Sequence, residues 1–224
     1  MKQLLVSLIS ITALLVAISS CRNDDGPFND QAALYDIVTF EGNKTAGAVF
    51  SFQRYDDSPL ITLTAPKTEI PLSTAKIGNR VILGYYPHSG KPYQTDNISV
   101  LSVSRINQDT LRIANPSELT GWDTTPVWLN SIWRSGKWIN VYMRVDYSNE
   151  ARVFNLSADS TTLDEPFIDL YLMHDILDAP QNFSRRAYIS VDISNVWQRP
   201  TCQGVRIFVN DKNRPQKATY SFSK

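Results

Sequence analysis

The feature that most constrains the fold of this 224-residue chain is a hydrophobic alternation with a period of two. In residues 138–147, WINVYMRVDY, every second residue from Ile139 to Val145 is apolar, and Asn140 and Arg144 lie on the opposite face. Such alternation is typical of a strand with one buried face. The pattern recurs at 127–133, 151–156, 168–172, 189–193, 205–209 and 218–222. About seven strands of this kind are expected of a compact sandwich, so we predict a β-sandwich domain over residues 127–224.

The N-terminal half contains shorter strand-like runs. They lie at 35–40, 48–53, 60–64, 81–86 and 98–106, and Gly, Pro and Asp clusters separate them. Five strands with long connections fit a small closed barrel of OB type, which we predict for residues 34–114. Residues 115–126, NPSELTGWDTTP, combine prolines, a glycine and hydroxyl residues, so we place the domain boundary there. We find no amphipathic helix and no internal repeat, and the predicted fold class is therefore all-β.

The first twenty residues have the pattern of an export signal. Lys2 precedes an apolar run, Leu4–Ile18, that is shorter than the ~20 residues needed to cross a bilayer. The run ends in Ile-Ser-Ser-Cys, which resembles the lipobox of bacterial lipoproteins. This resemblance implies that residues 1–20 are a signal peptide and that Cys21 becomes the acylated N-terminus. A double acyl anchor holds a protein stably on a membrane.

Residues 21–33 are polar and acidic, and we predict a flexible tether there. Arg22 stands where many lipoproteins retained at the inner membrane carry an aspartate. Asp24 and Asp25 resemble the acidic tag that sends some lipoproteins to the cell surface. We therefore expect an outer-membrane, lipid-anchored protein at the cell surface, with the periplasmic face of that membrane as the alternative.

Charge and cysteine content exclude several functions. The chain has 22 basic and 22 acidic residues, so no large net field favours nucleic acid, and we expect membrane contact only through the lipid anchor. If Cys21 is acylated, Cys202 has no partner for an intramolecular disulfide. Stability must then come from burial of apolar surface.

Catalytic and metal-binding motifs are weak. Ser73–Lys76 fits the S-x-x-K pattern of penicillin-binding proteins, but those enzymes need the serine at the start of a helix and a downstream K-T-G, and prolines precede it here. His88 and His174 are the two histidines, and no H-x-x-x-H or C-x-x-C spacing exists. We expect His174 to be a hydrogen-bonded structural residue. We therefore predict no catalytic residues, metal or cofactor, and a protein that is not an enzyme.

One loop collects aromatic side chains. Residues 85–93, YYPHSGKPY, hold Tyr85, Tyr86 and Tyr93 among prolines and a glycine. Barrels of OB type often present their binding surface in such a region, and exposed rings stack on sugars or fill a partner's pockets. These three tyrosines are the candidate ligand-binding residues, for a protein or a glycan. The alternative is that they cap the core of the barrel.

Several segments of the chain form one recognisable set. They are Cys21 with Asp24 and Asp25, Gly78–Val81, Ile132–Trp133, Trp138–Val141, Leu170–Asp175 and Ala187–Ser194. Together they resemble the NigD-like family of bacterial lipoproteins. The resemblance implies an OB-type N-terminal domain joined to a C-terminal β-sandwich, and a link to bacteriocin loci, but it implies no catalytic residues.

Three functions follow from this reading. The first is a non-catalytic binding or adhesion-like module at the cell surface. The second is a bacteriocin immunity or envelope-protection protein, which would bind one protein toxin. The third is a hydrolase whose site the known motifs do not reveal.

Overall fold

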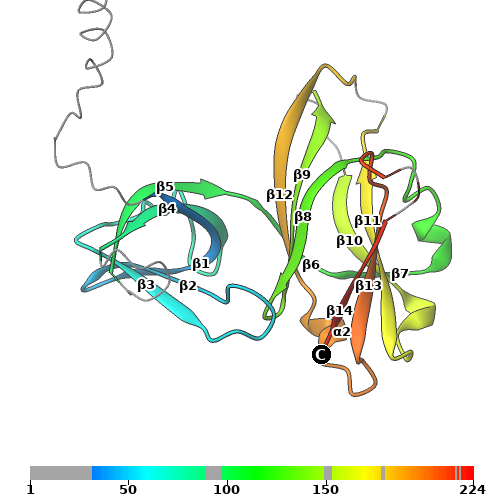
Figure 1. The fold of residues 1–224 in the computed structure, drawn as a ribbon, viewed down its shortest axis with the longest axis horizontal. Helices are drawn as coiled ribbons and strands as arrows, with labels where there is room; N and C mark the ends of the chain where they lie inside the picture. Colours follow the sequence, from blue (N-terminus) through cyan, green and yellow to red (C-terminus); the bar gives the residue numbers. More distant parts are fainter. Residues whose placement is uncertain (1–31, 89–96, 149–152, 178–179, 215, 217) are drawn as a thin grey trace, which may run out of the picture. The chain divides into compact units, whose positions relative to one another are not determined.

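The alternating runs form strands in the computed structural model, which describes residues 32–224 except 89–96, 149–152, 178–179, 215 and 217. The predicted signal peptide, Cys21, nearly all of the tether and Tyr93 lie outside the described residues. Three sheets account for nearly all of the regular structure, so the predicted all-β class is confirmed (Figure 1). Among the described residues, no helix is long and apolar enough to span a membrane.

The first sheet contains five antiparallel strands in the order β3-β2-β1-β4-β5. Bulges near Gly42 in β1 and Gly84 in β4 interrupt its register, and bulges bend a sheet. Its edge strands β3 and β5 come together at one isolated bridge, Thr64 to Asn97. The described part of this sheet is therefore curved but is not the closed barrel we predicted. The strands are β1 (Leu34–Lys44), β2 (Gly47–Phe52), β3 (Ile61–Pro66), β4 (Arg80–Pro87) and β5 (Ile98–Arg105).

A separate core lies on the concave side of this sheet. Phe40 and Phe50 are fully buried, and their ring centroids lie 5.4 Å apart. Both belong to the face that the period-two alternation marks as apolar. The other buried residues of this core include Val38, Leu63, Val81, Leu83, Tyr85 and Ile98.

The second half of the chain forms two sheets that enclose one core, as expected of a β-sandwich (Figure 1). One sheet has the order β14-β13-β11-β10-β7 and the other has the order β6-β12-β9-β8. Val141 and Ile189 from one sheet and Leu170 and Ile207 from the other are all buried in the shared core. The strands are β8 (Trp128–Ser135), β9 (Trp138–Tyr147), β10 (Val153–Asp159), β11 (Phe167–Asp175), β12 (Phe183–Asp192), β13 (Gly204–Val209) and β14 (Ala218–Ser223).

The chain joins the sandwich earlier than we predicted. Strand β6 (Asn107–Thr110) pairs in parallel with β12, and β7 (Arg112–Ala114) pairs in parallel with β10. The buried Leu111 between them marks the point at which the chain changes sheets. The sheets therefore change at Ile106 and not within residues 115–126, where the short helix η1 (Pro116–Leu119) lies. It stays a prediction that the chain divides into an OB-type domain and a sandwich domain and that these fold separately.

The remaining helices are short. They are η2 (Ser160–Thr162) and α2 (Ser194–Trp197). Helices this short contribute little stability of their own, so packing of the sheets supports the fold.

Buried arginines connect the first sheet to the sandwich. Arg80 on β4 donates hydrogen bonds to Ser190 Oγ on β12 and to Asn140 Oδ1 on β9, both at 3.1 Å. Its third partner is Thr39 Oγ1, at 3.2 Å. All three acceptors are uncharged, and burial lowers the pKa of Arg80 to about 10. The guanidinium therefore remains charged at neutral pH inside the protein.

Arg134 on β8 makes a second connection of this kind. Its side chain is 1% exposed and donates to both carboxylate oxygens of Asp57, at 2.9 and 2.7 Å. It also donates to the carbonyl of Gly136, and its guanidinium lies 4.4 Å from the ring centre of Trp197. Asp57 belongs to the connection between β2 and β3, so this pair ties that connection to the sandwich.

Candidate functional site

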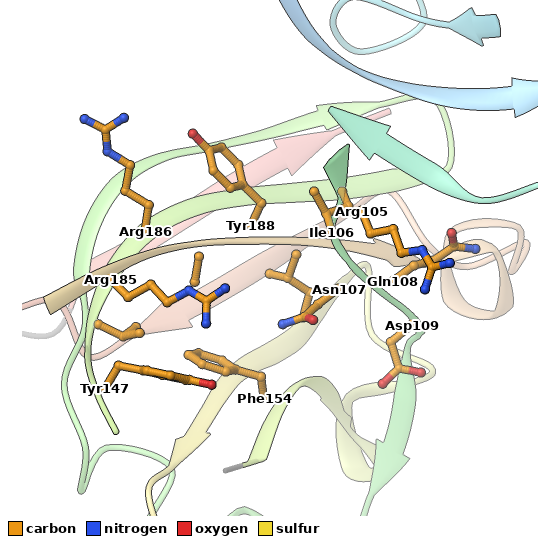
Figure 2. A pocket seen from close by; sticks show the side chains of 13 residues that line it. Arg105, Ile106, Asn107, Gln108, Asp109, Tyr147, Phe154, Arg185, Arg186 and Tyr188 are labelled. Carbon is orange, nitrogen blue, oxygen red and sulfur yellow. The ribbon is translucent and has the colours of Figure 1, made fainter. Parts of the chain in front are cut away.

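A cavity of about 690 Å³ lies beside β12, next to the start of β6. We call it the edge cleft (Figure 2). Arg185, Tyr147 and Phe154 lie on one side of β12 in this view, and Arg186 and Tyr188 lie on the other. The lining residues are Arg105–Asp109, Val145, Tyr147, Phe154 and Arg185–Ile189.

The backbone of β12 is partly unpaired along this cleft. Strand β9 pairs with β12 from Phe183 to Asp192, but β6 begins only at Ile189. In the part of the chain that the structure describes, no strand pairs with the other edge of residues 183–188. The sandwich therefore has an open strand edge here.

The hydrogen-bonding pattern shows which backbone groups face this open edge. The amide of Leu111 donates to the carbonyl of Asp192, so Asp192 directs its backbone groups away from β9. Because consecutive residues of a strand direct these groups to opposite edges, Ser184 and Arg186 also direct theirs away from β9. Their N–H and C=O groups are available to a strand that extends the sheet.

Positive charge is concentrated around this edge. Arg186 lies directly opposite Arg144 in the β12–β9 register, and like charges in that position repel. Neither of them, nor Arg185, forms an ion pair with any described residue. Their guanidinium groups instead lie near aromatic rings, Arg144 over Trp128 and Arg185 over Tyr147. The three arginines therefore have no paired carboxylate in the part of the chain that the structure describes.

The floor of the cleft is apolar. Val145 and Ile189 are buried there, and Phe154 and Ala187 are partly buried. The ring of Phe154 stacks on the imidazole of His174, with ring centroids 4.3 Å apart. His174 is buried beneath this ring, and its role as a hydrogen-bonded structural residue stays a prediction.

A smaller hollow of about 400 Å³ lies on the other face of the β12 sheet. It contains Tyr142 and Tyr188, whose rings stack in parallel with centroids 4.5 Å apart. Burial, followed by the hydrogen bond between the two hydroxyls, raises the pKa of Tyr188. Burial also raises the pKa of Asp36, which lines the same hollow. Because the two rings stack on each other, one face of each ring is covered and is not available to stack on a ligand.

The structure buries one of the three candidate tyrosines, and a ligand-binding role for Tyr86 and Tyr93 stays a prediction. Tyr85 belongs to β4, is 0% exposed, and donates from its hydroxyl to Asp36 Oδ2 at 2.8 Å. The alternative reading, in which this ring packs in the core, is therefore correct for Tyr85. Tyr86 is partly buried, and Tyr93 lies outside the described residues.

The other sequence candidates take structural positions. Ser73 of the S-x-x-K pattern lies in a turn and not at the start of a helix. Arg105 donates to the carbonyls of Ser73 and Thr74 and so holds this turn. His88 is exposed and bonds to Ser99 Oγ through Nε2. Among the described residues, no group of three potential metal ligands comes together.

Sequence reasoning missed the edge cleft. The cleft depends on where β6 starts, and Asn-Gln-Asp-Thr has no apolar alternation that would indicate a strand. The adjacent arginines Arg185 and Arg186, which precede the apolar alternation at 187–191, are the signal that the sequence offers for it.

No protein-family profile matches this sequence, and no curated protein matches it significantly. Several solved structures are nevertheless similar to it. A protein of unknown function from Bacteroides vulgatus is 16% identical with a TM-score of 0.65, over 86% of this chain and 91% of that one. A provisionally named lipoprotein from Bacteroides fragilis is 13% identical with a TM-score of 0.59, over 86% and 98% of the two chains.

A NigD-like immunity protein from Bacteroides caccae is also similar, at 17% identity and a TM-score of 0.54, over 85% of this chain and 96% of that one. At such identities the likeness concerns the fold alone. This chain therefore has the fold of a NigD-like protein, as its sequence motifs predicted.

Proposed function

We propose that this chain is a lipid-anchored, non-catalytic binding protein that holds a partner protein at the edge cleft. The observation that carries the proposal is the open edge of β12, where unpaired backbone groups and the arginines at 185 and 186 lie side by side. Exposed, unpaired strand edges are sites at which proteins associate with other chains.

The anchor belongs to the same proposal. The lipobox-like sequence before Cys21 supports acylation, and one similar structure carries a lipoprotein name. Asp24 and Asp25 favour display at the cell surface, on the outer membrane. A tether between the acyl chains and β1 would let the cleft reach partners beyond the lipid headgroups.

Binding is a better account of the cleft than catalysis. A hydrolytic site would need a nucleophile and a base in hydrogen-bond reach of each other, whereas the titratable groups that line the cleft are arginines, tyrosines and Asp109. The similar structures described above carry no enzyme names. Immunity against a toxin is one form that partner binding would take, and the name of the Bacteroides caccae protein agrees with it.

Site-specific photo-crosslinking in intact cells tests this function. A benzophenone amino acid replaces Phe183, an exposed aromatic residue of the open stretch of β12, in one variant and Lys44, which is exposed on the first sheet, in the control. Both variants keep Arg185 and Arg186. We expect a discrete protein adduct at 183 that is absent at 44 and absent without light. No adduct at 183, or equal adducts at both positions, would contradict a binding role for the cleft.

A further inference from the structure

The open edge of β12 has the dimensions of a binding site for one extended peptide. Residues 183–188 would span about 20 Å at roughly 3.3 Å per residue, enough to pair with a strand of about six residues. We infer that the partner inserts an extended segment that adds to β12 as a further strand, in line with the start of β6. This inference rests on the proposed function and names the chemistry of the partner.

Backbone geometry favours a peptide over other ligands. Ser184 and Arg186 direct both donor and acceptor groups to the open edge, spaced two residues apart. Only another extended polypeptide presents complementary donors and acceptors at the same spacing. A glycan or a lipid headgroup would use the guanidinium groups and leave this backbone ladder unpaired.

Charge then selects the class of peptide. Arg186 and Arg144 project together on one face of the sheet, and neither has a carboxylate partner among the described residues. Side chains on that face of an incoming strand would lie beside the Arg186 guanidinium, whereas the Arg144 guanidinium lies over Trp128 on the far side of β9. Acidic residues are therefore favoured next to Arg186. A second copy of this chain is disfavoured, because edge-to-edge pairing would bring further arginines against them.

The opposite face of the incoming strand would meet different surroundings. Its side chains would point between the two sheets, toward Phe154, Ala187 and Ile189. Apolar residues are favoured at these positions because they would cover the exposed part of that floor. The predicted ligand is thus a strand in which acidic and apolar residues alternate.

A defined peptide library is the probe. It contains peptides of about seven residues with Glu at every second position and varied apolar residues between. A matched library carries Lys in place of Glu, and a third carries Pro at the central position. Vesicles that contain phosphatidylglycerol serve as an anionic probe without a peptide backbone. All are tested against the full chain in detergent, by fluorescence anisotropy and by hydrogen exchange.

We expect the Glu library to contain binders at concentrations up to about 1 mM and to slow amide exchange across residues 183–188. The Lys and Pro libraries should contain none. Arg186→Glu should weaken binding by about ten-fold or more, whereas Lys44→Glu, an equal change of charge outside the cleft, should not. Ser184→Pro, which removes an edge N–H but no bond to β9, should abolish binding, and Ser184→Ala should retain it.

Several results would overturn the strand-addition mode. These are a Glu library without binders, unchanged binding by Ser184→Pro, or binding without protection of residues 183–188. Vesicles that bind through Arg186 while peptides do not would indicate an anionic lipid. The crosslink at position 183 distinguishes the binding function from the strand-addition mode. If it persists when the peptides fail, the binding function stands and strand addition is wrong. If peptides bind but no crosslink forms in cells, the function fails.

Discussion

The ion pair between Arg134 and Asp57 allows a sharp test of how the first sheet is held to the sandwich. Arg134 is buried, whereas the side chain of Asp57 is 70% exposed. Two short bonds join them, at 2.9 and 2.7 Å. We predict that Asp57→Asn destabilises the protein, because the buried guanidinium loses the charge of its nearest carboxylate and one of its three hydrogen-bond acceptors, the other two being the remaining Asp57 oxygen and the carbonyl of Gly136.

The magnitude follows from the geometry. Hydrogen bonds to charged groups contribute about 1.5–3 kcal/mol each when they are shielded from water. Asp57 is mostly exposed, so water screens its charge and weakens both hydrogen bonds, as it reduces the contribution of exposed ion pairs to stability. We therefore expect a loss of about 2 kcal/mol for the change. For a chain of this size that corresponds to a fall in Tm of roughly 6 °C.

Denaturant unfolding and scanning calorimetry measure the effect, with Asp56→Asn as the matched control. Asp56 is also exposed but lies farther from the guanidinium, at 3.7 Å, so its substitution should cost less than about 0.5 kcal/mol. Arg134→Met in a double-mutant cycle with Asp57→Asn should give a coupling energy of about 2 kcal/mol. Equal losses for the two aspartate variants would refute the reasoning.

The pH dependence has a definite sign. The hydrogen bonds from Arg134 are the main reason that the pKa of Asp57 is lowered. A lowered folded-state pKa means that this contribution to stability is present above the ordinary carboxyl pKa and is lost as pH falls through the lowered value. The stability difference between parent and Asp57→Asn should therefore be largest near neutral pH and shrink below about pH 4.

Three further predictions concern other parts of the chain. Cys21→Ala should leave an unprocessed precursor that no longer partitions into detergent with lipoproteins, and normal processing of this variant would contradict acylation at that residue. Cys202 is 3% exposed and its thiol donates to the carbonyl of Gly204, so a thiol reagent should label it at the rate of unfolding; rapid labelling of native protein would show that the site is open. Gly47 has φ of 135°, and a Cβ there would overlap the carbonyl of Ala65, so Gly47→Ala should lower the free energy of unfolding by about 3 kcal/mol. Gly78 has open space around it, so Gly78→Ala should lower it by about 1–2 kcal/mol. Equal losses of stability in urea unfolding would show that the overlap at Gly47 relaxes.

Local pattern was sufficient to locate most of the strands. The alternation in residues 138–147 predicted β9 with its bounds, and the runs at 81–86 and 205–209 lie within or match β4 and β13. A period of two encodes which face of a strand is buried. That information is local, so it can be read without knowing which strands are neighbours.

Which strands pair with each other cannot be predicted from local pattern in the same way. Strands β6 and β7 are short, and each pairs in parallel with a strand far along the chain. No local feature of Asn-Gln-Asp-Thr indicates that it extends the sheet of β12. Composition places the domain boundary at the Pro- and Gly-rich segment 115–126, which stays a prediction, whereas the pairing of β6 places the change of sheets at Ile106.

The tyrosine loop shows the same limit for a site. Composition marked residues 85–93 as aromatic and turn-rich, but only the sheet register decides that Tyr85 points inward to Asp36. A shift of one residue would expose it, since alternate residues of a strand face opposite sides.

The sequence by itself determined the all-β class and the positions of most strands, because both depend on residues that are neighbours along the chain. Tertiary structure alone decided where β6 begins, and therefore that no described strand pairs with the outer edge of residues 183–188 of β12, beside Arg186. Which strand pairs with which depends on long-range packing that no local pattern records.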